Sequence, residues 1–130
     1  TALLIVDFGT ATTFDYINSQ GAYCGGAIAP GIELANESLH LKTAQLPKVP
    51  IKKTARVIGK RTAQNMQAGV FHGYVGLTDH LVKKMCKESL ASPKVIATGG
   101  YAKLIAASSQ TIEKVHPDLT LEGLRLIWQS

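Results

Sequence analysis

The chain has few of the residues that build disulfide frameworks or zinc sites. It contains 2 cysteines and 4 histidines in 130 residues, with no Cys-x-x-Cys pair and no His-Glu-x-x-His motif. Zinc sites and disulfide-rich scaffolds depend on such spacings, so we expect neither a zinc site nor a disulfide. Cys24 and Cys86 are accordingly predicted to be reduced, buried thiols.

Long apolar runs are absent as well. No stretch reaches the length of a membrane span, and no charged-then-apolar leader resembles a signal peptide. We therefore expect a soluble, cytoplasmic protein with no membrane partner. The Gly-x-Ser-x-Gly elbow of hydrolases and the Walker A phosphate loop are also missing.

Aromatic residues make up only 6% of the chain, although its formal net charge is +5. Few aromatics interleave with the cations, so the sequence does not favour nucleic acid as a partner. A surface that receives an anionic small molecule or polyphosphate explains the charge equally well, and nucleic-acid binding would have to fall steeply with salt. Most of the cations lie in one segment that also holds Pro47 and Pro50: Lys42, Lys48, Lys52, Lys53, Arg56, Lys60 and Arg61.

The hydrophobic content of 45% is enough for one domain with a core, which we assign to residues 1–130. The chain starts at Thr1 and enters an apolar stretch almost at once. We expect it to be a piece of a longer polypeptide whose N-terminal half is absent.

The junction at Asp7 is the most informative feature. Residues 2–6 form a continuous apolar run, which predicts a strand buried on both faces that ends at Asp7. Gly9 lets the backbone approach a ligand closely, and three threonines add hydroxyl groups. This pattern predicts a phosphate site with a bridging cation, although a hairpin whose polar side chains only satisfy the turn remains an alternative. The threonines are Thr10, Thr12 and Thr13.

The remaining pattern predicts an α/β fold with a mixed sheet, made of a three-stranded meander plus one further strand, packed by helices. Further strands are expected at residues 12–18, 22–29 and 93–97, with a bulge or close ligand approach at Gly25-Gly26. Helices are expected at residues 30–43, 63–90, 101–115 and 119–128. The second of these carries Gly69, Gly73 and Gly76, which would permit close packing against another element.

A glycine pair also separates the last predicted strand from its helix, in Thr98-Gly99-Gly100. Such a turn can hold a nucleotide between the backbone and the helix N-terminus. A plain tight turn from strand to helix is the alternative.

The order of the motifs along the chain is more specific than any one of them. Asp-Phe-Gly-Thr-Ala-Thr-Thr, Gly-Gly-Ala-Ile-Ala-Pro-Gly, Leu-Pro, Gly-Lys-Arg-Thr, Thr-Gly-Gly and Leu-Thr-Leu-Glu-Gly-Leu follow one another over nearly the whole sequence. Together they resemble type III pantothenate kinase. The resemblance implies a ribonuclease-H-like fold of the actin-like ATPase superfamily, with this chain as the C-terminal half of a two-domain kinase.

The resemblance also implies roles for individual residues. Asp7 would bind the monovalent cation, K⁺ or NH₄⁺, while Gly9 and Thr10 would lie at the ATP, which these enzymes use with Mg²⁺. The segment Thr98-Gly99-Gly100 would lie along the adenosine, and Thr62 would contact pantothenate at a homodimer interface. Arg61 stands where the family more often has Asn.

Two motifs of this family do not occur in the sequence: Asp-x-Gly-Asn-Thr, its phosphate loop, and Gly-Ala-Asp-Arg, whose Asp is the catalytic base. The resemblance implies ATP-dependent phosphorylation of pantothenate, the first step of coenzyme A synthesis, by the complete enzyme. We expect no catalytic residue here and an inactive isolated chain, which would need the N-terminal domain of the same polypeptide. A non-catalytic regulatory or binding module on the same fold is the alternative.

Overall fold

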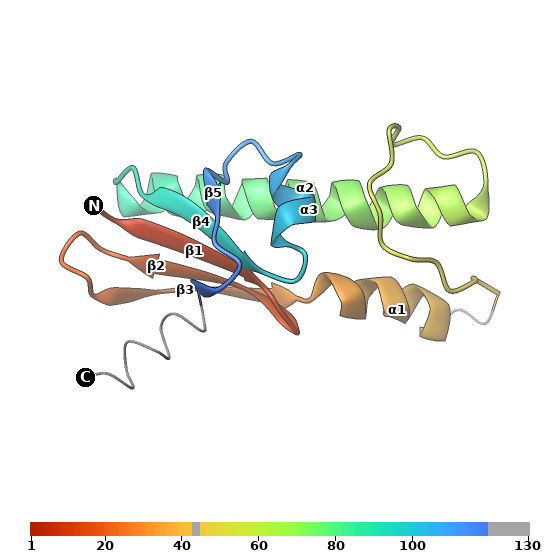
Figure 1. The fold of residues 1–130 in the computed structure, drawn as a ribbon, viewed down its shortest axis with the longest axis horizontal. Coiled ribbons are helices and arrows are strands. Elements are labelled where there is room, and N and C mark those ends of the chain that lie inside the picture. The colour runs from red at the N-terminus through yellow and green to blue at the C-terminus, as the bar shows by residue number, and fades with distance from the viewer. Residues whose placement is uncertain (43–44, 120–130) are drawn as a thin grey trace.

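The computed structural model describes residues 1–42 and 45–119, which form an α/β fold (Figure 1). Its strands are β1 (Leu3–Phe8), β2 (Ala11–Ile17), β3 (Tyr23–Pro30), β4 (Lys94–Gly99) and β5 (Lys114–Val115). Its helices are α1 (Ile32–Lys42), α2 (Thr62–Ser89) and α3 (Ala102–Ala106). The predicted strands and the long helix are thus confirmed to within about two residues.

The five strands make one mixed sheet in the order β3-β2-β1-β4-β5. The meander β1-β2-β3 is antiparallel, whereas β4 runs parallel to β1 and β5 runs parallel to β4. The predicted meander is confirmed, but the sheet has one strand more than expected, because the two-residue β5 is too short to give a periodic signal. The carboxyl ends of β1 and β4 lie side by side at one end of the sheet. Because Asp7 lies there, this end is called the Asp7 edge, or the edge.

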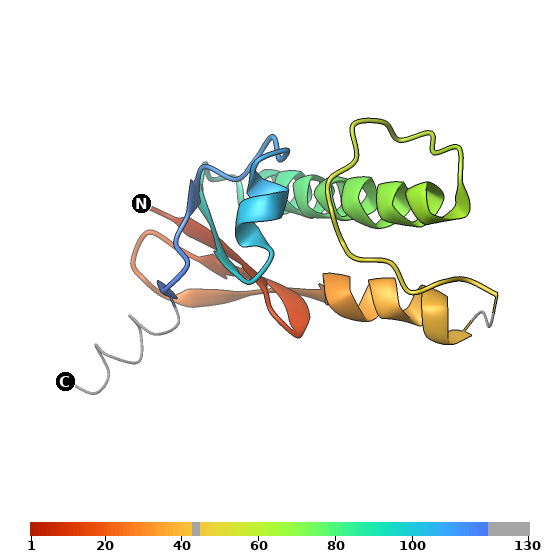
Figure 2. The same ribbon diagram turned by 45° about the vertical axis from the view of Figure 1, so that its right-hand side comes forward.

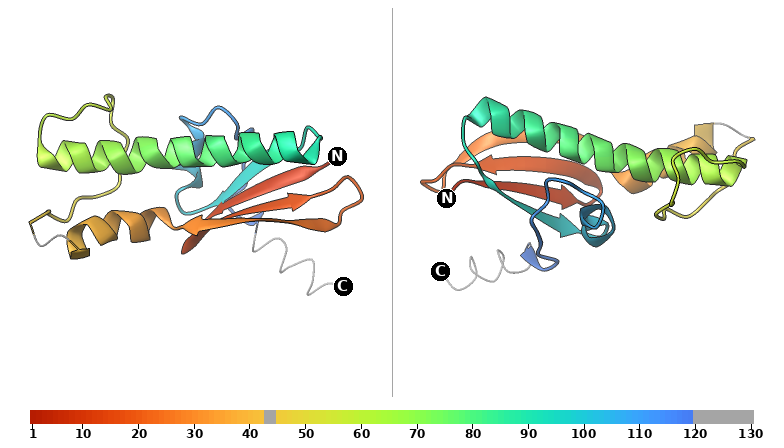
Figure 3. Two further views of the ribbon diagram at one scale, coloured as in Figure 1. Left: turned by 180° about the vertical axis from the view of Figure 1, so that it is seen from behind. Right: turned by 90° about the horizontal axis from the view of Figure 1, so that it is seen from above.

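Strand β1 does not have two buried faces, so that prediction is wrong. Leu4, Val6 and Phe8 are buried on one face, whereas Leu3, Ile5 and Asp7 are only half-buried on the other. Helix α2 lies along the first face and contributes Val70, Phe71, Tyr74 and Val82 to the same core (Figure 3). Asp7 also lies within β1 and not beyond its end.

Helix α2 extends past the sheet and runs beside α1, which begins where β3 ends (Figures 1 and 3). The segment of residues 45–61, here called the strap, returns from α1 to the start of α2 (Figure 2). A methyl group added at Gly69, Gly73 or Gly76 would meet no described atom within 4 Å apart from the adjacent residues and the backbone of α2 itself. Within the described chain these glycines therefore make no close helix packing. Residues 43–44 and 120–130, and with them most of the helix predicted at 119–128, lie outside the description.

The predicted helix at residues 101–115 is largely wrong, since α3 ends at Ala106. The next residues turn back because the side chains of Ser109 and Thr111 each donate to Asp79 of α2, at 2.6 Å.

Pro30 belongs to β3, so α1 starts two residues later than predicted. The bulge expected at Gly25-Gly26 is confirmed by a register shift between β2 and β3 and by a φ of 109° at Gly25.

Both cysteines are free thiols, as predicted. Cys24 lies exposed on the edge strand β3, however, so the expectation that it is buried is wrong, and Cys86 is half-buried. Burial, and then the nearby Glu113 carboxylate, raises the pKa of Cys86.

No helix in residues 1–42 and 45–119 has the length and apolar character of a membrane span.

Candidate functional site

Asp7 lies beside the ends of two neighbouring strands. In the sheet register it is opposite Thr98 of the parallel strand β4 and opposite Thr13 of β2. Its side chain is half-buried, and no hydrogen bond or ion pair reaches its carboxylate from the described residues. In α/β proteins, ligands bind outside the carboxyl ends of parallel strands, where a free carboxylate is available to them.

Gly99 makes room for this carboxylate. Its φ of 98° lies in the left-handed region, and a Cβ at this position would be 2.6 Å from the Phe8 carbonyl oxygen and 2.7 Å from Asp7 Oδ1. A side chain here would be strained and would collide with both β1 and the carboxylate. The structure therefore brings together Asp7 and the Thr-Gly-Gly segment, two motifs that lie 91 residues apart in sequence.

The turn at Gly9 and Thr10 forms the next part of this edge. Both residues are exposed, and Gly31 presses so closely on the Thr10 carbonyl that a Cβ at Gly31 would clash with it. The Tyr74 hydroxyl donates to the carbonyls of Pro30, at 2.9 Å, and Gly31, at 3.2 Å. Burial raises the pKa of Tyr74, so it remains a protonated donor. Helix α2 thereby fixes the backbone that supports the turn.

The threonines of the Asp7 motif differ in their surroundings. Thr12 is fully buried and donates its hydroxyl to the Pro30 carbonyl at 3.2 Å, so it serves the packing and is not available to a ligand. Thr10 is exposed and Thr13 is half-buried. Only part of the predicted row of hydroxyls thus reaches the surface.

The β4 side of the edge is tied to α1. Thr98 is buried, Gly100 is exposed, and the following Tyr101 donates its hydroxyl to Glu33 Oε1 at 3.1 Å. Burial, the hydrogen bond to Glu33 and the charge of Glu33 raise the pKa of Tyr101. The Thr-Gly-Gly turn, the start of α1 and the Gly9-Thr10 turn consequently border one another.

Thr62 is not part of this edge. It is the first residue of α2, whereas Tyr74, which supports the edge, comes twelve residues later in the same helix. At 1.5 Å per residue these positions are about 18 Å apart along the axis. Thr62 is exposed at the end of the strap, and no described contact connects it to Asp7.

Sequence reasoning missed the residues that support the edge. Gly31 ends the Gly-Gly-Ala-Ile-Ala-Pro-Gly motif, and its place directly after Pro30 is a turn signal that could have found it. Tyr74 lies within the helix predicted at residues 63–90, and nothing in the sequence shows that its hydroxyl reaches a carbonyl 44 residues away. The Tyr101–Glu33 pair is equally non-local.

Comparison with known families identifies the family of this chain. A family model described as type III pantothenate kinase matches residues 1–84, which include Asp7, the Gly9-Thr10 turn and Thr62. The chain belongs to the type III pantothenate kinase family. The resemblance found in the sequence is thereby confirmed, as is the mixed α/β architecture that this family implies.

Curated type III pantothenate kinases match almost the entire chain. The protein from Citrifermentans bemidjiense is 59% identical over 129 residues, which are 99% of this chain and 51% of that protein. The protein from Listeria monocytogenes is 48% identical over 129 residues, or 99% of this chain and 50% of that protein. The chain therefore spans about half the length of the curated relatives that it matches.

A solved structure shares the fold. A candidate transcriptional activator of the Baf family from Campylobacter jejuni superposes with a TM-score of 0.63 at 24% sequence identity. The match covers 98% of this chain and 57% of that one. At this level of identity the likeness concerns the fold alone.

Proposed function

We propose that this chain is the C-terminal half of a pantothenate kinase that transfers the γ-phosphoryl group of ATP to pantothenate, the first step of coenzyme A synthesis. Its fold is then ribonuclease-H-like, of the actin-like superfamily, and its location is the cytoplasm. The observation that carries the proposal is the unpartnered Asp7 carboxylate at the carboxyl end of β1, directly beside the positive-φ Gly99 of β4. Family membership supports the same reaction.

Phosphoryl transfer requires that the reacting groups be positioned and that the charge on the phosphates be neutralised. In our proposal Gly9 and Thr10 contact the phosphates through the turn backbone and the exposed Thr10 hydroxyl. Thr98, Gly99 and Gly100 form the wall along the adenosine. The bonds from Tyr74 to Pro30 and Gly31 hold the turn, so the donors do not have to be ordered when the nucleotide binds.

The donor set at Asp7 fits a hard cation. Its carboxylate is half-buried and unpaired, and carboxylate oxygen is a preferred ligand of Mg²⁺ and other hard cations. Across the described ranges no three His, Cys, Asp or Glu side chains cluster as a metal site, so Asp7 would share its cation with phosphate and water oxygens. A bound K⁺, NH₄⁺ or Mg²⁺ ion would supply positive charge next to the phosphates. Asp7 itself would only hold and orient that ion.

The catalytic base is not assigned to this chain, which lacks the Gly-Ala-Asp-Arg motif. We propose that the N-terminal half of the polypeptide provides it. Thr62, about 18 Å from the edge along α2, would then contact pantothenate across a homodimer interface, where it meets the edge of the other subunit.

The deciding experiment measures ADP release by a polypeptide that carries both halves. ATP and magnesium are supplied with and without pantothenate, first in potassium buffer and then in sodium buffer. We expect release only when pantothenate and potassium are both present. Folded protein that releases no ADP under any of these conditions would contradict the proposal and favour a non-catalytic binding module.

The isolated chain of residues 1–130 provides the second test. We expect no phosphorylation of pantothenate by it, because the base is missing. Detectable ATP-dependent product from this chain alone would show that the assignment of the base to the other half is wrong.

A further inference from the structure

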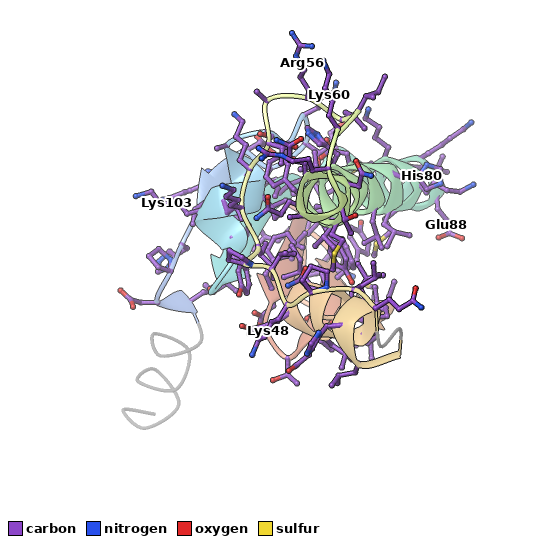
Figure 4. The ribbon with its side chains drawn as sticks, turned by 90° about the vertical axis from the view of Figure 1, so that its right-hand side faces the viewer. Lys48, Arg56, Lys60, His80, Glu88 and Lys103 are labelled. Carbon is purple, nitrogen blue, oxygen red and sulfur yellow. The ribbon has the colours of Figure 1, made fainter. Side chains whose placement is uncertain are left out.

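A cleft of about 560 Å³ lies between the strap and the first two turns of α2. Its charged lining consists entirely of cations: Lys52, Lys53, Arg56 and Lys60. None of its described lining residues is acidic. In Figure 4, Arg56 and Lys60 lie together on the strap, whereas Lys103 of α3 and Lys48 project elsewhere. This cleft is the most one-sided concentration of charge among the described pockets.

Among the described residues, no acidic side chain pairs with these four cations. Like charges held in one concavity repel one another and focus a positive potential that attracts anions. A bound anion with several charges would remove this repulsion.

The strap is held in shape before any ligand arrives. Gln67 of α2 donates to the Pro50 carbonyl at 3.1 Å, and the His72 ring nitrogen lies 3.1 Å from both the carbonyl and the hydroxyl of Thr54. The Thr54 hydroxyl in turn donates to the Arg56 carbonyl at 2.8 Å. Because its backbone is fastened to the long helix, the strap would lose little conformational entropy on binding.

The start of α2 adds to the same field. Arg61, the residue before the helix, forms no side-chain cap, and the first turn holds no acidic residue. The first N–H groups of a helix have no partner inside it, and they carry a partial positive charge that favours anions. The residues preferred at this position are Asn, Asp, Ser and Thr, whose side-chain oxygens accept from these N–H groups. Here the helix end and the four side chains favour the same kind of ligand.

We propose that this cleft binds a small ligand with at least two phosphate groups. One carboxylate would leave three of the four cations unneutralised, and one phosphate, with a charge of about −1.5 to −2, would leave about half of them. A diphosphate or triphosphate chain carries enough charge to match all four. The proposal does not depend on the kinase activity and concerns a surface apart from the Asp7 edge. Two sources share this chemistry: the phosphate chain of a nucleotide and a free polyphosphate.

Calorimetric titration of the 130-residue chain tests the proposal, with tripolyphosphate as the probe. We expect binding that weakens as the salt concentration rises. Arg56→Gln and Lys60→Gln should each reduce the affinity about tenfold, the value of one charged hydrogen bond. The matched control is Lys103→Gln, an exposed cation on α3, which should change the affinity less than twofold. All three positions are exposed, so folding should persist, and circular dichroism verifies it.

Titrations with other ligands identify the source of the phosphate groups. ATP binding as tightly as tripolyphosphate, with AMP much weaker, would indicate a nucleotide phosphate chain; tripolyphosphate binding more tightly than ATP would indicate a free polyphosphate. Either result supports the site if the Arg56 and Lys60 variants lose affinity. Equal affinities for these variants and for Lys103→Gln would overturn the proposal. Tighter binding of a random single-stranded oligonucleotide than of tripolyphosphate would overturn it too, in favour of nucleic acid.

Discussion

Asp7 and Asp79 are two aspartates in the same fold with opposite surroundings. Asp79, on α2, is buried and accepts hydrogen bonds from the Ser109 hydroxyl and the Thr111 hydroxyl, each at 2.6 Å, and from the Gln110 backbone N–H at 2.8 Å. Asp7, on β1, is half-buried and accepts none from the described residues. One carboxylate is fully engaged in the structure, whereas the other remains available.

The difference shows how the role of a carboxylate follows from its partners. Burial alone would raise the pKa of Asp79, but the hydrogen bonds from Gln110, Ser109 and Thr111 outweigh it and hold that pKa below its usual range. Those bonds fix the loop between α3 and β5. At Asp7 the same chemical group has no such donors, and Gly99 keeps the space in front of it open.

Removing the Asp79 carboxylate should have the largest effect on stability. Asp79→Ala leaves two hydroxyls and one N–H without their acceptor and should lower the free energy of unfolding by about 3 kcal/mol. Urea denaturation of the variant and the parent chain measures this change. A loss below about 1 kcal/mol would mean that water replaces the carboxylate and that the loop does not depend on Asp79.

Asp7→Asn should change activity strongly and stability very little. With no hydrogen bond to lose, the free energy of unfolding should change by less than about 0.5 kcal/mol. In the polypeptide with both halves, the potassium-dependent release of ADP should fall roughly 100-fold, since the charge that holds the cation is gone. If potassium dependence stays unchanged, Asp7 is not the cation ligand.

Gly99→Ala tests whether the space before Asp7 is necessary. The new Cβ would lie 2.7 Å from Asp7 Oδ1 and 2.6 Å from the Phe8 carbonyl oxygen, at a φ of 98°. We expect a loss of about 2 kcal/mol in the free energy of unfolding from strain and displacement. Gly73→Ala is the matched control, since its Cβ would meet no described atom within 4 Å outside the adjacent residues and the backbone of α2. That variant should gain up to about 1 kcal/mol. Equal effects at the two sites would contradict the tight fit at Gly99.

Local patterns predicted the elements of this fold well and their partners poorly. The 3.6-residue period located α2, and apolar runs bounded by glycine located β1, β3 and β4. The helix predicted at 101–115 failed because Ser109 and Thr111 bind Asp79, which lies about thirty residues earlier in the sequence. Such a contact depends on where α2 lies, and no local period reports it.

The candidate site follows the same division. The sequence contained Asp7, the Gly9-Thr10 turn and Thr98-Gly99-Gly100 as separate motifs, and the parallel pairing of β1 with β4 brings the first and last together. The close approach of Gly31 to Thr10 and the hydrogen bonds from Tyr74 are seen only in the three-dimensional structure. The cations of the strap were visible in the sequence, but their shared cleft at the start of α2 was not.

The smallest expected effect is a dependence on pH of the difference in free energy of unfolding between the parent chain and Asp79→Asn. The pKa of Asp79 in the folded chain is lower than the value near 4 that an aspartate has in an unfolded chain. The ionised carboxylate therefore stabilises the fold above about pH 4. This contribution is lost as the pH falls through the folded pKa, since both states then bind the proton. Asp79→Asn keeps the shape of the side chain and cannot titrate. The parent chain should therefore exceed this variant in free energy of unfolding at pH 7, and the difference should shrink by pH 3. A difference that stays constant with pH would show that the neutral acid accepts the three hydrogen bonds as well as the carboxylate does.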